Sequence, residues 1–379
     1  MRILKHKTNI DFLKYRRAAM FLSSLGNIAI LVGIAVFGFN FGVDFAGGTL
    51  VEVQFSEAVV DQSIREAGTQ GGLADFQVQS IGTREDNTFL LRVGGTTQLT
   101  EAHAAHVEAS LRKQAEVKSF YADLGNGLLN LRTAEKMDAQ ALSQTAGTSE
   151  AAVKEVRELG ESQSGGFDYQ IVFSGMAEKV QTALKVGMAK QTFEIRRVDY
   201  VGPQVGKQLR NKGVAALVYA ALSIIVYVAF RFDFKFGPGA LVSMLHDVLM
   251  ASGYYLLTQR EFNLTAIAAL LTVVGYSIND TIVIYDRIRE EMARFKGKPF
   301  SEIINLSINE TLSRTILTGG VTALSLIGLL IFGVGEIFDF AAAMLVGIVV
   351  GTYSSIFVAS PVTLWFEKYL GKDKKAKPA

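Results

Sequence analysis

Six runs of apolar residues constrain this chain more than any other feature of its sequence. They cover approximately residues 18–39, 213–230, 239–258, 263–285, 315–334 and 338–366. Each run can cross about 30 Å of hydrocarbon as an α-helix, which needs roughly twenty residues. Hydrophobic side chains make up 49% of the 379 residues and charged ones only 20%, which is typical of a membrane protein. We therefore predict six transmembrane helices.

The first run follows a polar, basic segment at residues 1–17, and this order also fits a secretory signal peptide. However, the run is longer than the apolar part of a typical signal peptide, and residues 42–45 form a poor cleavage site. An uncleaved first helix over residues 18–39 is therefore favoured.

The lysines and arginines in the short flanks of the runs predict the orientation of the helices. They gather before helix 1, between helices 2 and 3, between helices 4 and 5 and after helix 6, whereas the 3–4 loop has only Arg260 and the 5–6 loop has none. Basic short loops stay on the cytoplasmic side. We expect residues 1–17 and the basic tail 367–379 to be cytoplasmic, and the segment between helices 1 and 2 to lie outside.

That outer segment, residues 40–212, is the one long polar part of the chain. Its patterns predict strands near residues 50–55, 76–81, 89–93, 128–131, 169–174 and 193–198, and helices near 60–67, 100–116, 139–146, 149–159 and 176–188. This mixture predicts an α+β domain, with two ferredoxin-like βαββαβ units as one arrangement of it. The glycine-rich residues 160–166 are expected to be a flexible connector.

Several polar side chains interrupt the membrane-spanning runs. Helix 4 carries Ser277, Asn279 and Asp280, and helix 3 carries His246 and Asp247. A carboxylate at the centre of a membrane helix costs roughly 2.5–3.5 kcal/mol on insertion scales, so it needs a functional or structural reason.

Arg314, near the cytoplasmic end of helix 5, is the partner predicted for Asp280. With a rise of about 1.5 Å per residue, Asp280 lies roughly 8 Å and His246 roughly 10 Å inside the cytoplasmic ends of their helices, and the long Arg314 side chain reaches inward. An Asp280–Arg314 ion pair is therefore feasible. Ser277 shares the face of Asp280, whereas Asn279 points nearly opposite and is expected to bond a different neighbour.

Each of these residues has a plain structural alternative. Asp280 and Arg314 could form a static ion pair, or Arg314 could extend to the interface. His246 and Asp247 could be a second proton-relay station or could hydrogen-bond between helices. The charged residues 286–291 are read as a solvated cluster at the interface, and the glycines of helices 5 and 6 as close-packing positions.

Cysteine and histidine usage limits the other chemistries. The chain has no cysteine, which excludes disulfides and cysteine-based metal or nucleophile sites. His103 and His106 lie three residues apart on a predicted helix, a spacing that suits a metal, but no third ligand is evident and surface histidines are favoured. No cofactor, metal or nucleic-acid partner is expected.

Five motifs together make the chain similar to the SecF family of protein-export membrane subunits, within the resistance–nodulation–division transporter superfamily. They are residues 41–53 (FGVDFAGGTLVEV), 201–206 (VGPQVG), 243–248 (SMLHDV), 275–290 (GYSINDTIVIYDRIRE) and 311–315 (TLSRT). The resemblance covers both flanks of the outer domain and all six helices. Any one motif alone is weak, but the set is specific.

This resemblance implies a multi-pass subunit of the bacterial inner membrane, with a periplasmic domain. It implies a complex with SecD beside the SecYEG channel, in which ion flow drives the pulling of an unfolded secretory polypeptide. The family's transport carboxylate and arginine match Asp280 and Arg314. Proton and sodium remain open as the ion, and the few oxygen ligands near Asp280 favour the proton.

One departure from the family is the length of the outer segment, with an excess near residues 100–166. This enlarged insertion could bind the client, SecD or a periplasmic factor, or it could be inert.

Three other functions compete with protein export. A pump for small molecules or lipids from the same superfamily usually carries two such halves in one chain, and this chain holds one. An intramembrane aspartyl protease using Asp247 and Asp280 would need Gly-x-Gly-Asp, whereas the sequence before Asp280 is Ser-Ile-Asn. A passive receptor would need one anchoring helix rather than six. We expect a transport subunit rather than an enzyme.

Overall fold

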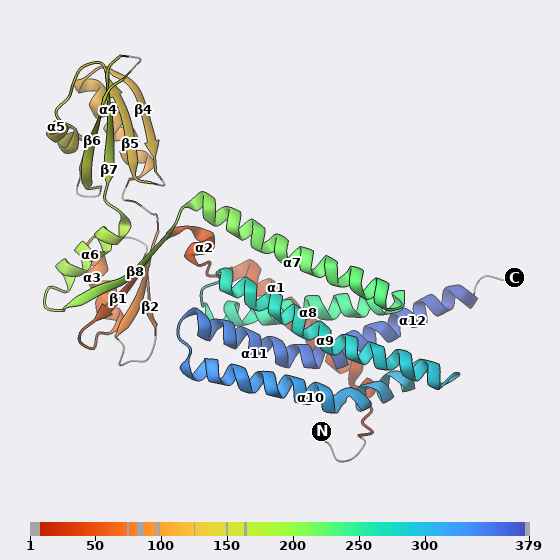
Figure 1. Cartoon of the computed structure of the whole chain (residues 1–379). Coiled ribbons are helices and arrows are strands. Elements are labelled where there is room, and N and C mark those ends of the chain that lie inside the picture. The colour runs from red at the N-terminus through yellow and green to blue at the C-terminus, as the bar shows by residue number, and fades with distance from the viewer. Residues whose placement is uncertain are drawn as a thin grey trace. The chain divides into compact units, whose positions relative to one another are not determined.

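The six predicted transmembrane helices are present in the computed structural model, which describes residues 8–73, 76–81, 87–94, 97, 99–124, 126–148, 151–162 and 165–375. Five of them are α1 (Arg16–Phe37), α7 (Pro203–Arg231), α8 (Gly237–Thr258), α9 (Leu264–Arg294) and α10 (Phe300–Phe332) (Figure 1). The sixth is α11 (Glu336–Ser354), a π turn (Ser355–Ala359) and α12 (Ser360–Lys375) in succession. Of the segments predicted at 1–17 and 367–379, residues 1–7 and 376–379 lie outside the described residues.

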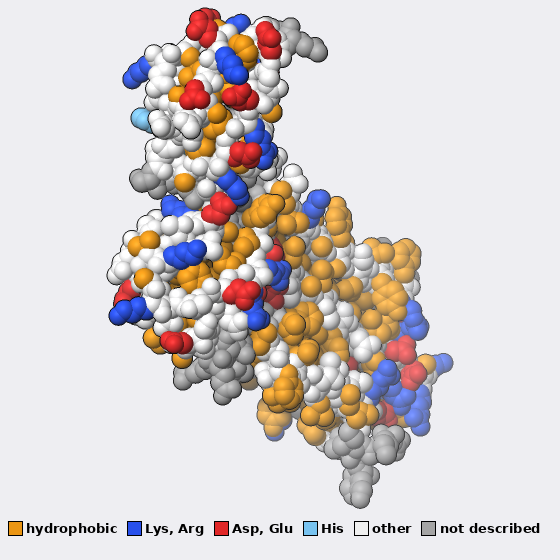
Figure 2. Space-filling model, turned by 60° about the vertical axis from the view of Figure 1, so that its left-hand side comes forward, with side chains coloured by type: hydrophobic (Ala, Val, Ile, Leu, Met, Phe, Trp, Pro, Cys, Tyr) orange, Lys and Arg blue, Asp and Glu red, His pale blue; other side chains and the backbone are white. Residues whose placement is uncertain are grey.

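The chain divides into a helical unit, which runs to Phe41 and resumes at Arg210, and a second unit over Gly42–Leu209. In the helical unit the third, fourth and sixth spans form the core, since 56% of the apolar window of each is buried. Only 11% of the corresponding windows of α1 and α7 and 17% of that of α10 are buried. Hydrophobic side chains accordingly cover much of the visible face of this unit (Figure 2). Most of their surface is left for lipid or another chain.

Two glycines of α11 allow the core helices to approach closely. A Cβ at Gly347 would overlap the Val273 side chain, and one at Gly351 would lie 2.9 Å from Cβ of Ser277. Both neighbours belong to α9, so a side chain at either position would push the two helices apart. The prediction that these glycines serve close packing is confirmed for this pair.

The first lobe of the second unit is a ferredoxin-like fold. Its sheet has the antiparallel order β2-β3-β1-β8, with β1 (Gly48–Phe55), β2 (Phe76–Ile81), β3 (Thr88–Val93) and β8 (Phe193–Val201). One face, including Val51, Val53 and Leu91, packs against α3 (Asp61–Gln70) and α6 (Met176–Gly187). The alternation of buried and partly exposed residues along β1 produces this one-sided core.

The second lobe is inserted between β3 and α6 and has the same architecture with a different chain order. Its elements are α4 (Glu101–Gln114), β4 (Val117–Asp123), β5 (Leu128–Thr133), α5 (Ala139–Ala146), β6 (Val153–Glu161) and β7 (Phe167–Phe173). The sheet order is β4-β5-β7-β6. β7, the last strand in sequence, occupies the place of a ferredoxin first strand, so the lobe is a circular permutation of that fold. The expectation of two ferredoxin-like units is thus confirmed in architecture, and the insertion has its own core.

Two predictions in this lobe need correction. The helix expected over 149–159 is wrong, because β6 forms an edge strand paired antiparallel with β7; residues 149 and 150 lie outside the described part. Val156 lies opposite the buried Ile171, a pairing that only tertiary contacts supply. The glycine-rich connector is largely the β6–β7 hairpin turn, closed by Ser162 N–H donating to Gly166 O at 2.8 Å; residues 163 and 164 are not described.

Candidate functional site

The most polar part of the helical core is built around Asp247 of α8, which is fully buried. Its Oδ2 accepts hydrogen bonds from the hydroxyls of Ser277 on α9 and Ser354 on α11, the latter at 2.7 Å. Its Oδ1 lies 2.8 Å from Nδ1 of His246. Three neighbours therefore converge on one carboxylate and tie three helices together at one level of the bundle, which is how a buried charged group is accommodated.

His246 lies on another face of α8, although it is adjacent to Asp247 in sequence. Its side chain is 2% exposed, and its ring centroid lies 6.2 Å from that of Tyr353. The Tyr353 hydroxyl donates to the Ala19 carbonyl of α1 and accepts from Ser23. Nε2 of His246 is buried and no described residue bonds it. His246 thus lies beside Tyr353, whereas Asp247 bonds Ser277 of α9 and Ser354 of α11.

Hydroxyl contacts continue from this cluster along α9 and the sixth span. Thr281 and Ser355 hydroxyls lie 2.8 Å apart, and those of Tyr285 and Thr363 lie 2.9 Å apart. Ser355 also begins the π turn, where Ser360 Oγ donates to the Ser355 carbonyl at 3.0 Å. Single π turns inside helices often occur at functional sites.

Asp280 lies one turn beyond Ser277 and is 3% exposed, so it is a buried carboxylate as predicted. Arg314 is exposed on α10, and the pair does not occur among the ion pairs of the described residues. Their feasible pairing therefore stays a prediction that requires α9 or α10 to move, or the Arg314 side chain to turn inward. Asn279 is exposed, on a different face from Asp280, and bonds none of the described side chains.

The sequence reasoning missed Ser354 as a ligand of Asp247. The signal was a pair of serines, Ser354 and Ser355, after Tyr353 within an otherwise apolar run. It also missed an ion pair at the opposite end of the helices, where Arg260 and Asp339 lie 2.8 Å apart and Tyr254 donates to Asp339 at 2.9 Å. That second cluster joins the α8–α9 connection and the end of α8 to the first turn of α11.

The charged residues 286–291 form an ion-pair network, but the prediction of a solvated cluster is wrong for Glu291, which is 1% exposed. Arg287 contacts Glu290 at 2.5 Å, Glu291 at 2.8 Å and also Glu310. At the same end, the segment before α1 is held by α10: Asn309 Nδ2 donates to the Ile10 carbonyl at 2.8 Å, and Ile10 N–H donates to Asn309 Oδ1 at 2.9 Å.

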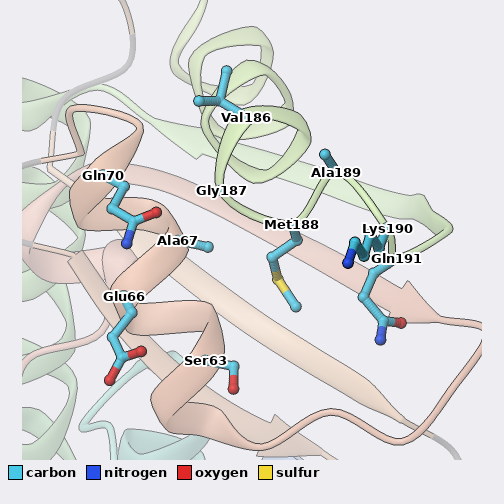
Figure 3. Close-up of a pocket in the computed structure, with 10 residues that line it drawn as sticks. All are labelled: Ser63, Glu66, Ala67, Gln70, Val186, Gly187, Met188, Ala189, Lys190 and Gln191. Carbon is cyan, nitrogen blue, oxygen red and sulfur yellow. The ribbon is translucent and has the colours of Figure 1, made fainter.

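The second unit offers no comparable cluster of charge or metal ligands within its described residues. A hollow of about 410 Å³ lies between α3 and the end of α6 with the segment that follows it, and Glu66, Met188 and Gln191 line its wall (Figure 3). His103 is held structurally, since its Nε2 lies 2.9 Å from the Ala146 carbonyl and its ring packs edge-on against Phe173.

One ion pair on the open face of the second lobe is well formed. Arg132 Nε donates to Asp168 Oδ1 at 2.7 Å and Nη2 to Oδ2 at 3.1 Å. Hydrogen bonding to this guanidinium lowers the pKa of the Asp168 carboxyl from its ordinary value.

Fold and site together define a multi-spanning membrane protein with buried carboxylates in its helical core and a two-lobed extramembrane domain between its first two helices. Two family models match the chain: "Protein export membrane protein SecD/SecF, C-terminal" over residues 180–369 and "SecD/SecF GG Motif" over residues 32–59. The chain belongs to the SecF family. Within the shorter match, Gly47 and Gly48 both have positive φ, at 75° and 129°, so the entry into β1 requires glycine.

Relatives match along nearly the whole chain. The protein translocase subunit SecF of Magnetococcus marinus is 38% identical, over 96% of this chain and 94% of its own. The SecF of Rickettsia felis is 33% identical, over 97% and 94%. A crystal structure of SecDF from Thermus thermophilus, a translocon-associated membrane protein, superposes with a TM-score of 0.64 at 27% identity. That match covers 97% of this chain but only 40% of the SecDF chain.

Proposed function

We propose that this chain is the SecF-type subunit of a protein-export complex and works with SecD. In this proposal the complex uses the proton-motive force to promote late translocation of unfolded secretory polypeptides that emerge from the SecYEG channel. The observation that carries the proposal is the pair of buried carboxylates, Asp247 and Asp280, inside the membrane helices of a SecF-family chain. A buried carboxylate that can gain and lose a proton as its neighbours move is a means of coupling ion flow to motion.

In this mechanism Asp280 binds the transported proton and Arg314 is its counter-charge in one of two states. When Asp280 is ionised, Arg314 turns inward and pairs with it; when Asp280 is neutral, Arg314 stays exposed on α10. Asp247 and Ser277 support the site by joining α8 and α9, His246 supports it by bonding Asp247, and Asn279 supports it from the exposed face of α9.

A partner chain is supported by polar side chains on exposed helix surfaces of the described spans. Thr272 and Asn279 are polar residues on one exposed line of α9, and Arg314 is exposed on α10. Such groups are costly to leave in lipid and are favourable between helices. We assign this surface to SecD, which would supply the remainder of the ion pathway.

The proposed location is a bacterial inner membrane with both termini in the cytoplasm. Contacts within the helical unit place the segment before α1 and the α9–α10 connection at one end, since Asn309 bonds Ile10. The short connections at that end are rich in Lys and Arg, whereas the two short connections at the other end, residues 259–263 and 333–335, contain Arg260 alone. The second unit, which follows α1, would then be periplasmic.

Asp280→Asn tests the proposal. With SecD and the channel in inverted vesicles, the variant should lose stimulation of export by a proton gradient while still inserting and binding SecD. Asp233→Asn is the matched control, because Asp233 is 68% exposed in the α7–α8 connection. Full gradient-dependent export by Asp280→Asn would refute the assignment.

The alternative is one half of another proton-coupled exporter, of small molecules or lipids, from the same superfamily. Co-purification from native membranes separates the two, since SecD and the channel should accompany this chain only under the export proposal.

A further inference from the structure

His246 and Asp247 do more than join helices: we propose that they form a second proton-binding site, in which His246 takes the proton on Nε2 from water held between α1 and α8. This inference rests on the proposed function only for its use in transport. The site itself follows from the contacts of the two side chains.

The hydrogen bonds of Asp247 determine which nitrogen of His246 is the basic one. Oδ2 accepts hydrogen bonds from two serine hydroxyls, and Oδ1 lies 2.8 Å from the imidazole Nδ1. An ionised carboxylate has no hydrogen to donate, so in this proposal Nδ1 is the donor. With Nδ1 carrying its hydrogen toward Asp247, a neutral imidazole keeps its lone pair on Nε2. That atom is buried and has no partner among the described residues, so it is an acceptor without a donor.

The net charge of the His246–Asp247 dyad also supports a proton on Nε2. An ionised Asp247 beside a neutral His246 leaves one net negative charge in the core, and no Lys or Arg of the described residues is paired with it. Adding a proton to Nε2 converts the dyad into an imidazolium–carboxylate pair of zero net charge. The dyad therefore has two states that differ by one proton, and the neutralised one suits a low-dielectric surrounding.

The face of α8 that carries His246 indicates from which side a proton reaches Nε2. Residues 246, 250 and 253 share one face of α8. Met250 lies against Gly26 and Gly253 against Ile30, so α1 and α8 run in parallel along this seam. This register places Asn27 of α1 about 6–8 Å farther along the seam than His246, a span that two waters in series bridge.

Asn27 supplies an independent observation at this seam. Its Oδ1 is also buried and has no described partner. The amide oxygen of Asn27 accepts from one water of this bridge, and Nε2 of His246 accepts from the next. Two orphaned buried polar atoms on facing helices are thus satisfied together. The other titratable groups near His246 are Tyr353 on α11, whose hydroxyl is engaged with α1, and Asp280, one turn from Ser277 on α9.

The test is ¹⁵N nuclear magnetic resonance of the full chain in lipid nanodiscs, labelled at its histidines, with the His246 signals assigned by their loss in His246→Gln. We expect Nδ1 to carry hydrogen at all pH values, Nε2 to gain hydrogen as the pH falls, and magnetisation to pass from water to the ring. In Asn27→Leu the water transfer should be lost. Ser24→Ala is the control, since Ser24 lies on an exposed face of α1 and should leave the transfer intact.

A neutral His246 with its hydrogen on Nε2, or a ring without water transfer in the wild-type chain, would overturn the inference. These readouts do not involve export. If they hold while Asp280→Asn exports normally, the proton-binding site stands and the proposed function fails. If Asp280→Asn abolishes gradient-driven export while the His246 hydrogen is on Nε2, the proposed function stands and this inference fails.

Discussion

The two serines that bind Asp247 should be energetically coupled, because both donate to the same carboxylate oxygen, Oδ2. Hydrogen bonds between membrane helices average roughly 0.6 kcal/mol and reach about 1.7, whereas bonds to charged groups contribute about 1.5–3 kcal/mol in soluble proteins. We expect Ser354→Ala or Ser277→Ala alone to cost about 1 kcal/mol, because one donor to Oδ2 remains. The double variant should cost about 3 kcal/mol, because it leaves a buried oxygen without a donor.

The assay is reversible unfolding in mixed micelles by increasing detergent denaturant, followed by circular dichroism, for the wild type, both single variants and the double variant. Ser325→Ala is the matched control, since its hydroxyl bonds only the Val321 carbonyl of its own helix and is exposed. It should lie within about 0.5 kcal/mol of the wild type. Additive losses, or a double variant as stable as either single one, would refute the reasoning that Asp247 is an ionised hub.

Three further predictions concern other parts of the chain. Arg314→Lys keeps the charge but loses the planar fork, so gradient-driven export should fall severalfold if Asp280 is bound in bidentate fashion; wild-type rates would indicate a simple point charge. Asn309→Leu removes both bonds to Ile10 and should free the segment before α1 at a cost of about 1–2 kcal/mol, measured as faster hydrogen exchange there; unchanged exchange would contradict it. Arg132→Ala should destabilise β5 and β7 at neutral pH. The lowered pKa of Asp168 gives a stabilisation that is fully present above its unfolded value of about 4 and is lost as the pH falls through the lower folded value, so the difference from the wild type should shrink in that range; a difference that is unchanged in acid would be inconsistent with the ion pair.

Residue patterns predict some features of the buried site and not others. Helical periodicity predicts correctly that Asp280 is buried and that it shares a side of α9 with Ser277. It also draws attention to His246 and Asp247 as a pair. It cannot predict that Ser277 serves Asp247 rather than Asp280, because that depends on how α8 and α9 are aligned along the membrane.

The error over residues 149–159 has a similar cause. Lys154, Glu155, Arg157 and Glu158 are helix-compatible residues, and their exposure as an edge strand becomes clear only once β7 lies beside them. The circular permutation of the second lobe cannot be predicted locally either, because it depends on the order of the strands in the sheet; the strand predictions also missed β4 and β6.

Membrane thickness and hydrophobic periodicity act over neighbouring residues, so residue patterns alone predict the six spans, the α+β insertion and the buried carboxylates. Which polar groups meet depends on the packing of the helices. Gly347 and Gly351 let α11 approach α9, and that approach brings Ser354 to Asp247. The reason is physical: a hydrogen bond depends on helix register and distances of a few tenths of an ångström, which arise from packing between distant segments.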